Sequence, residues 1–219
     1  MTKSGQGALD LAADKQRALA LTPVSRETEQ RLNNFVALLL LWQNKFNLVA
    51  SSTLPILWTR HIADSLQLLP LAPAATVWVD FGAGAGFPGI PIACALADRP
   101  GAMVHLVESV GKKANFLREV VHKLGLPAQV HQERAEKFGE SCAEAVDVVT
   151  ARALAPLKVL CDQAFPLIAK GAVGLFPKGQ DVAAELTEAA KYWRLEASTV
   201  PSVTSPDSAI VIIRHLAMR

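Results

Sequence analysis

The residues of clearest chemical interest lie between Val77 and Gly89, where a short apolar run ends in an acid and glycine then recurs at every second position. The acid is Asp80, and the glycines are Gly82, Gly84 and Gly86. Glycine has no Cβ, so a turn built from it lets a ligand approach the backbone closely. Since each glycine also costs chain entropy on folding, the stretch predicts a strand, a ligand-binding turn and a helix.

Two classes of cofactor use such a turn. The spacing Gly84-x-Gly86-x-x-Gly89 fits the fingerprint of dinucleotide-binding proteins, which place an acid about 20 residues further on, as Glu108 does here. When the spacing is counted from Asp80 instead, it fits the first motif of methyltransferases that use S-adenosylmethionine. Both interpretations place the ligand against the same turn.

Two prolines favour the second class. Pro88 and Pro91 fall in or beside the first turn of the helix, and each removes a backbone N–H. A pyrophosphate needs those donors at the positive end of the helix dipole, whereas S-adenosylmethionine has no phosphate. Its ammonium group can bind a carboxylate such as that of Asp80. We therefore expect S-adenosylmethionine as the cofactor and keep a dinucleotide-dependent oxidoreductase as an alternative.

Alternating strands and helices must position this turn. After residue 75 the pattern predicts strands at 76–81, 102–108, 129–133, 145–150 and 172–176, helices at 88–97, 110–124, 156–169 and 181–192, and a last antiparallel strand pair at 195–200 and 209–215. Such alternation is typical of an α/β fold with a mostly parallel, doubly wound, Rossmann-like sheet that binds its ligand at the carboxyl ends of the strands. We expect this domain to span residues 76–219.

The chain before this domain, residues 1–75, predicts a helical extension. Residues 1 to about 25 are polar and alanine-rich, and we expect a loose tail with some helix there. From Ser25 to Trp42 apolar residues recur at helical spacing on more than one face, so this helix is expected to be buried. A second helix, beginning after position 53 or 55, is expected to carry the segment 60–66.

Composition excludes several other classes of protein. The 219 residues carry a formal net charge of +2, which is too small to predict nucleic-acid binding by itself. The longest apolar runs are far shorter than the ~20 residues that span a bilayer, and the N-terminus contains no signal-peptide core. Three widely spaced cysteines, and histidines without metal-ligand spacing, predict neither disulfides nor a metal site. We expect a monomeric cytoplasmic protein.

Six motifs follow one another between about residues 30 and 180. They are Arg60-His61-Ile62-Ala63-Asp64-Ser65-Leu66, Gly84-Ala85-Gly86-Phe87-Pro88-Gly89-Ile90-Pro91, Glu108-Ser109-Val110-Gly111-Lys112-Lys113, Arg134-Ala135-Glu136, Ala151-Arg152-Ala153 and Pro177-Lys178-Gly179. By these motifs the sequence closely resembles the ribosomal small-subunit RNA methyltransferase G family, also called glucose-inhibited division protein B. It departs from the family pattern at Ala83, where a small hydroxyl is common, and at Glu108, where aspartate is usual.

The resemblance implies transfer of a methyl group from S-adenosylmethionine to N7 of one guanine, conventionally 527, in the 16S ribosomal RNA of a small-subunit particle. On the matching positions it places Gly82 and Phe87 against the cofactor, and Ala135 and Glu136 at the adenine end. Arg152 would complete the pocket and is the candidate catalytic residue. A non-catalytic RNA-binding or assembly factor with a relic cofactor fold is the alternative from a different class.

Charged side chains add further candidates. Glu108 follows the second strand, where a carboxylate can accept hydrogen bonds from both hydroxyls of a ribose. Arg152 is expected on an exposed carboxyl edge of the sheet, with the methionine carboxylate or an RNA phosphate as its partner. Because phosphate contacts supply much of the affinity for RNA, the candidate RNA-binding residues are Arg60, His61, Lys112, Lys113, Arg118, Lys123 and Lys178. A solvated helix face explains the basic residues between 112 and 123 equally well. Docking of the N-terminal helix on the catalytic domain is an alternative role for Arg60 and His61.

Overall fold

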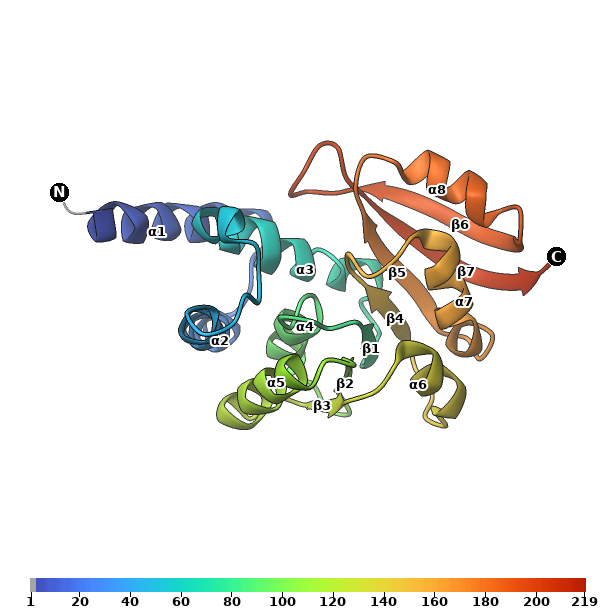
Figure 1. Cartoon of the computed structure of the whole chain (residues 1–219), viewed down its shortest axis with the longest axis horizontal. Helices are drawn as coiled ribbons and strands as arrows, with labels where there is room; N and C mark the ends of the chain where they lie inside the picture. The colour runs from blue at the N-terminus through green and yellow to red at the C-terminus, as the bar shows by residue number, and fades with distance from the viewer. Residues whose placement is uncertain (1–2) are drawn as a thin grey trace.

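A single seven-stranded sheet forms the centre of the computed structural model, which describes residues 3–219, with side chains from residue 11 onward (Figure 1). The strands are β1 (Val77–Phe81), β2 (Met103–Val107), β3 (Ala128–His131), β4 (Val148–Ala151), β5 (Val173–Lys178), β6 (Trp193–Pro201) and β7 (Ala209–Met218). Their order in the sheet is β3-β2-β1-β4-β5-β7-β6. The first five strands are parallel, and β7 is antiparallel to both of its neighbours. The predicted mostly parallel α/β sheet and its antiparallel pair are confirmed.

Five helices connect these strands. They are α4 (Gly89–Leu96), α5 (Gly111–Leu124), α6 (Ala135–Ser141), α7 (Leu157–Ile168) and α8 (Val182–Ala189). Helix α5 ends at Gly125, whose φ of 58° is left-handed and therefore suits glycine. Among the described residues, no helix combines the length and the apolar character that a membrane crossing requires.

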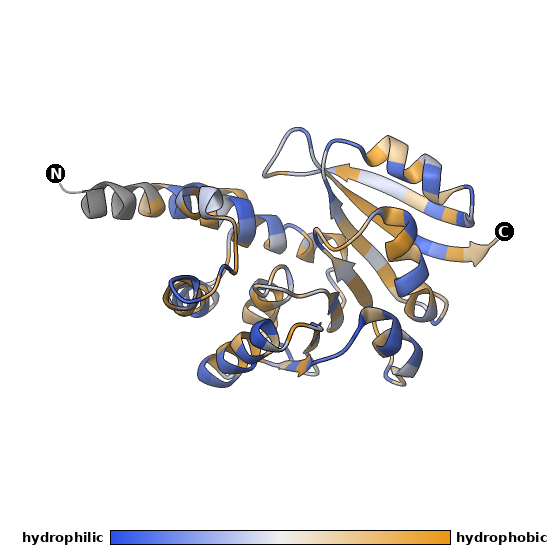
Figure 2. Ribbon diagram, viewed as in Figure 1, coloured by the Kyte–Doolittle hydropathy of each residue, from blue (hydrophilic) through white to orange (hydrophobic). Residues whose placement is uncertain are grey.

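The sheet separates two apolar cores, because successive residues of a strand point to opposite faces. Trp78 on β1 belongs to one core, together with residues of α2, α4 and α5. Its neighbour Val79 and then Phe81 belong to the other core, which α6 and α7 complete. In Figure 2 the central strands are mainly hydrophobic, whereas the helices beside them carry both colours. The glycine turn that follows β1 is thus supported from both faces of the sheet.

The N-terminal part is helical. It consists of α1 (Lys3–Leu21), α2 (Arg26–Gln43), the 3₁₀-helix η1 (Ser51–Ile56), the π-helix η2 (Trp58–Ala63), α3 (Asp64–Leu66) and the 3₁₀-turn η3 (Leu69–Leu71). The expected loose tail is wrong, since residues 3–21 form one helix with Asp14 and Ala18 fully buried. Residues 1 and 2 of that expected tail lie outside the described residues.

Helix α1 is anchored by the buried carboxylate of Asp14. Its Oδ2 accepts hydrogen bonds from the backbone N–H groups of Trp58 (2.8 Å) and Thr59 (3.1 Å), and its Oδ1 accepts one from the Thr59 hydroxyl. These are the first N–H groups of η2, which have no acceptor within their own helix. Asp14 therefore caps the helix that carries Arg60 and His61.

The N-terminal helices and the sheet share an apolar core. Phe35 on α2 packs edge-on against Phe87 in the glycine turn, with ring centroids 5.3 Å apart. Trp42 at the end of the same helix lies 5.5 Å from Phe116 on α5. The division of the chain into residues 1–75 and 76–219 stays a prediction.

Candidate functional site

The glycine turn leaves β1 at the carboxyl edge of the sheet, where β2 lies on one side and β4 on the other. Ligands of doubly wound sheets bind at this reversal of strand order. Gly82 and Gly86 have φ angles of 65° and 92°, which are unfavourable for residues with a Cβ. A Cβ on Gly82 would lie 2.6 Å from Cδ1 of Leu154, and one on Gly86 would lie 2.6 Å from Cγ1 of Ile90. The turn therefore needs glycine for both its backbone conformation and its space.

Asp80 lies beneath this turn. Its side chain is fully buried, and its Oδ2 accepts a hydrogen bond from the Gly89 N–H (2.8 Å) at the start of α4. Its Oδ1 has no partner among the described residues. Burial raises the pKa of this carboxyl to about 7, while the Gly89 N–H and the charge of Arg152 oppose the rise. Asp80 does not line the cleft described below, and its expected contact with an ammonium group stays a prediction.

The start of α4 leaves few N–H groups for a phosphate. The Gly89 N–H donates to Asp80, and the Ile90 N–H donates to a carbonyl of the turn at 2.8 Å. Pro88 and Pro91 have no N–H to donate. The donors that a pyrophosphate would require are thus occupied or missing, which agrees with the preference for S-adenosylmethionine over a dinucleotide.

A cleft runs along the turn in two connected halves. The first half, about 270 Å³, lies between the ends of β1 and β2 and the start of α6. The second half, about 260 Å³, lies between the turn and η2. Gly82, Lys113 and Ala153 line both halves, so the two halves adjoin along the turn.

Glu108 is the buried acid of the first half. Its Oε2 accepts a hydrogen bond from the Gly84 N–H (2.9 Å) and its Oε1 accepts one from the Val110 N–H (2.7 Å). Only 5% of the residue is exposed. A carboxylate oxygen can accept more than one hydrogen bond, so Glu108 keeps capacity for ribose hydroxyls while the backbone fixes its position.

The opposite wall of this half begins α6. Ala135 is buried, and Glu136 accepts a hydrogen bond at its Oε1 from the Gln163 amide (2.8 Å). That hydrogen bond holds the pKa of the Glu136 carboxyl below its usual value. Val107 and Leu154 add apolar surface to the same wall. Apolar side chains beside backbone and a carboxylate suit a planar heterocycle such as adenine.

Arg152, directly after β4, is the centre of the second half. Its guanidinium donates to the Arg60 carbonyl (3.2 Å), to Nδ1 of His61 (2.9 Å) and to Oδ2 of Asp64 (3.3 Å). It also lies 5.1 Å from the ring centroid of Phe87. The expected exposure is wrong, because only 15% of the side chain is accessible. Burial lowers the pKa of Arg152, and the Asp64 carboxylate opposes that change.

His61 is held neutral beside this arginine. Burial lowers the pKa of its imidazole to about 3, and the charges of Arg152 and Arg60 add to the effect. A guanidinium can only donate, so Nδ1 must accept and the proton resides on Nε2, which donates to Thr53 Oγ1 at 2.9 Å. The ring stacks on Phe87 with a centroid distance of 4.8 Å. With both nitrogens engaged and 8% of the residue exposed, His61 positions Arg152, in contrast to the expected contact with RNA.

Asp64 is the site residue that sequence reasoning missed. Its Oδ1 accepts hydrogen bonds from Nε2 of Gln67 (2.8 Å) and from Oγ1 of Thr204 (2.9 Å). Oε1 of Gln67 in turn accepts from the Val203 N–H (2.9 Å). This network ties Arg152 to the loop between β6 and β7. An acid four residues after Arg60 was the only local signal, and the partners Arg152 and Thr204 lie 88 and 140 positions away.

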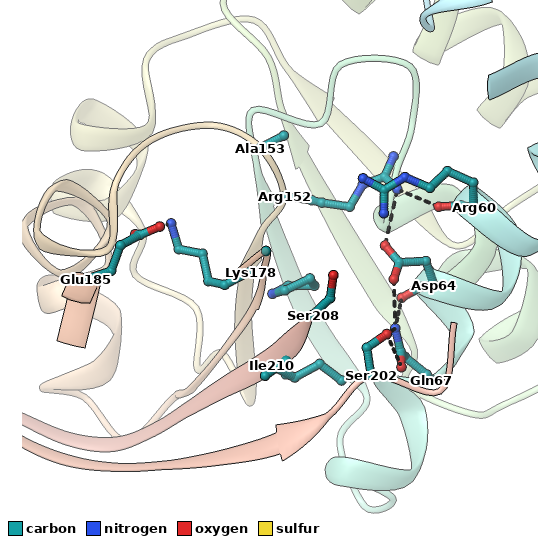
Figure 3. A pocket seen from close by; sticks show the side chains of 13 residues that line it. Arg60, Asp64, Gln67, Arg152, Ala153, Lys178, Glu185, Ser202, Ser208 and Ile210 are labelled. Carbon is teal, nitrogen blue, oxygen red and sulfur yellow. Dashed lines mark hydrogen bonds and ion pairs between the residues drawn. The ribbon is translucent and has the colours of Figure 1, made fainter. Parts of the chain in front are cut away.

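A second cavity, about 240 Å³, opens on the other side of Arg152 (Figure 3). Arg60, Arg152 and Ala153 line both this cavity and the cleft. Ala153 has a φ of 52°, which is uncommon for a residue other than glycine. Such strain persists where the surroundings impose it, and it is concentrated at ligand sites.

Lys178 lies in this second cavity rather than on the surface. Its Nζ is 2.6 Å from Oε2 of Glu185 and donates to the Ala155 carbonyl at 2.9 Å. Only 10% of its side chain is exposed. The expected phosphate contact does not fit an ammonium that is buried and already paired.

The other basic candidates fall into two groups, those paired on the α5 surface and those nearer the cleft. Arg118 donates to Gln132 (3.2 Å), and Lys123 pairs with Glu119 (2.7 Å), so both have intrachain partners on the α5 surface. Arg60 and Lys113 line the cleft, whereas Nζ of Lys112 lies 5.3 Å from the ring centroid of Phe46. Among the described residues, no three His, Cys, Asp or Glu side chains gather to hold a metal ion.

Solved structures share this fold. Cofactor-bound Rv0187 from MTB superposes with a TM-score of 0.58 at 16% identity over 85% of this chain and 90% of that one. A mutant of MtNAS in complex with S-adenosylmethionine superposes with a TM-score of 0.52 at 18% identity over 85% and 76%. Both share the α/β fold of this chain, and one of them is a complex with S-adenosylmethionine.

Sequence comparison then gives the family. The model of the family described as rRNA small subunit methyltransferase G (GidB) matches residues 28–216. A Ribosomal RNA small subunit methyltransferase G from Bradyrhizobium sp. (strain ORS 278) is 59% identical over 218 residues, which cover 100% of this chain and 98% of that relative. The relative of the same name from strain BTAi1 is 61% identical over 203 residues, or 93% and 91% of the two chains. The chain belongs to the rRNA small subunit methyltransferase G family, and the expected resemblance is confirmed.

Proposed function

We propose that this protein transfers a methyl group from S-adenosylmethionine to N7 of guanine 527 in 16S ribosomal RNA. The observation that carries the proposal is that the glycine-lined cleft and the second cavity adjoin, with Arg152 and Ala153 in the walls of both. One space can thus hold a cofactor while the adjoining space receives a base. Membership of the family supports both the donor and the RNA substrate.

The cleft fits S-adenosylmethionine by its own chemistry. The backbone of Gly82 lines the cleft without a Cβ, and Glu108 offers lone pairs at the end of β2. We place the ribose at Glu108 and the adenine against Ala135 and Glu136. The guanidinium of Arg152 would repel a sulfonium, so its remaining N–H groups suit the methionine carboxylate or an RNA phosphate.

The chemistry requires orientation and no base. S-adenosylmethionine supplies an electrophilic methyl group on a positively charged sulfur. Guanine N7 carries a lone pair and no proton, so its attack forms the N–C bond while the electron pair of the S–C bond stays on sulfur and positive charge passes to the purine. A general base would add nothing, which agrees with the neutral and fully engaged His61. Holding the two reactants in line contributes about 7–11 kcal/mol.

Recognition of the RNA depends on local charge and on shape. Arg60 is exposed at the junction of cleft and cavity, and Lys112 and Lys113 begin α5 beside it. Phosphate contacts from such residues position a nucleic acid. Because the net charge is only +2, we propose that the substrate is the folded small-subunit particle, met by a monomer in the cytoplasm.

Methyl transfer from labelled cofactor to small subunits that lack the modification tests this function. The expected result is one methyl group per particle, with much slower transfer to short RNA fragments. Cofactor binding without any transfer would contradict the proposal and favour a non-catalytic assembly factor. Tight binding of a nicotinamide dinucleotide in place of S-adenosylmethionine would contradict it as well.

A further inference from the structure

A carboxylate borders the second cavity on its α8 side (Figure 3). Glu185 on α8 lines this cavity with 28% of its side chain exposed. Its Oε2 accepts from the Leu157 N–H (2.6 Å) and pairs with Nζ of Lys178 (2.6 Å). Its Oε1 has no hydrogen-bond partner among the described residues. The carboxylate is therefore held through one oxygen, and the other is available to a ligand.

Most other polar groups of the cavity have partners within the chain. Gln67 uses its amide oxygen for the Val203 N–H and its amide nitrogen for Asp64. Ser208 donates to Ser205 at 3.1 Å. An acceptor thus remains at the α8 wall, and spare donors remain at the opposite wall, where Arg152 uses three N–H contacts of the five that a guanidinium has.

Guanine carries edges that match this arrangement. N7 and O6 are acceptors on one edge of the base, whereas N1–H and the 2-amino group are donors on the Watson–Crick edge. For transfer to N7, that atom must face the cleft across Ala153. O6, which neighbours N7, then falls on the side of Arg152, and the 2-amino group, the farthest from N7, reaches toward the opposite wall.

We propose that the second cavity is the pocket for the target base and that Glu185 selects guanine there. Its free Oε1 accepts hydrogen bonds from N1–H and the 2-amino group, as enzymes that extrude a base commonly read its Watson–Crick edge. The inference rests on the proposed N7 transfer, because the direction of N7 sets the direction of the opposite edge. Lys178 acts as a positioning residue that holds the carboxylate against the wall.

The same carboxylate disfavours adenine. Adenine also has a lone pair at N7, but its N1 is an acceptor and it has no 2-amino group, so an acceptor would oppose the Oε1 of Glu185. Unpaired buried acceptors are costly, and good bidentate base contacts discriminate roughly 5- to 150-fold. Glu185 would therefore provide base selection in a pocket whose other contacts could accept either purine.

Inosine in place of the target guanosine tests this role, because inosine keeps N7, O6 and N1–H and lacks only the 2-amino group. Small subunits assembled with each nucleoside are compared by kcat/KM for methyl transfer. We expect the wild type to prefer guanosine by about fivefold or more. Glu185→Gln should lose most activity on guanosine and lose the preference, since the amide oxygen can keep the contacts to Leu157 and Lys178 while the amide N–H₂ opposes the donors of the base.

Glu188→Gln is the matched control, because Glu188 lies on the same helix with 52% of its side chain exposed and pairs with Lys191. It should keep both the rate and the preference. Thermal melting and cofactor titration of each variant separate base selection from folding, since misfolding would lower transfer to both particles equally.

Two results would overturn the base pocket while leaving N7 transfer intact. One is equal use of guanosine and inosine by the wild type, which decides the matter even if Glu185→Gln does not fold. The other is an unchanged preference in a folded, cofactor-binding Glu185→Gln. Absence of N7 methylation by the wild type on guanosine particles would overturn both the proposed function and this inference.

Discussion

Replacing Asp14 with alanine should destabilise the protein by about 3 kcal/mol, although Asp14 lies outside the residues matched by the family model. The side chain is fully buried and accepts hydrogen bonds from two backbone N–H groups and one hydroxyl of η2. Loss of a helix cap costs about 0.5–2 kcal/mol, and each buried donor left without an acceptor costs about 1–3 kcal/mol. Relaxation and water entry reduce the sum to about 3 kcal/mol.

Urea denaturation measures this effect, with the midpoint falling and the slope unchanged. For a chain of this size, about 3 kcal/mol corresponds to a lowering of Tm by roughly 6–12 °C. Arg17→Ala is the matched control, because it removes the exposed partner of the Asp14 ion pair and leaves the buried hydrogen bonds in place. An exposed ion pair contributes less than about 1 kcal/mol. A loss in Asp14→Ala no greater than that in Arg17→Ala would refute the capping role of α1.

Three further outcomes are expected. Gly82→Ala should weaken cofactor binding about tenfold in calorimetric titration, because its φ is left-handed and its Cβ would lie 2.6 Å from Leu154. Adding Leu154→Ala should recover only the steric part of this loss, and an unchanged affinity of Gly82→Ala would contradict the tight turn. Folding raises the pKa of the Asp80 carboxyl to about 7, so the folded protein binds the Asp80 proton more tightly than the unfolded chain does. The resulting contribution to the free energy of unfolding is lost as pH rises from about 4 to 7. Asp80→Asn should flatten that part of the stability profile in urea titrations, and an unaltered profile would argue against burial of the charge. Arg60→Ala should reduce the salt dependence of particle binding by about one phosphate contact, and an equal slope would remove Arg60 from the interface.

The local pattern was sufficient for the sheet and for the turn. Apolar runs separated by glycine and proline predicted β1 to β5 to within a few residues, because buried parallel strands leave strong local signals. The glycines at 82, 84 and 86 predicted the binding turn for the same reason, since backbone conformation and close approach are local properties. The preference for S-adenosylmethionine followed from two prolines, and the occupied N–H groups of α4 agree with it.

The local pattern was insufficient where side chains depend on distant partners. Helix α1 was missed because polar contacts of Asp14 with residues 44 and 45 positions away help to hold it in place, and no apolar stripe predicts them. The burial of Asp80, His61 and Lys178 likewise has no local signal, because it results from partners that only the tertiary structure brings near.

The central claim is that one methyl group is transferred to N7 of a single guanine, and mapping the modified atom tests it most directly. Small subunits lacking the modification are incubated with the purified protein and labelled S-adenosylmethionine, and the RNA is then cleaved chemically at N7-methylguanosine. We predict one cleavage, at position 527, in an amount equal to the label incorporated before cleavage. Label on an exocyclic amine, or at another nucleotide, would contradict the account.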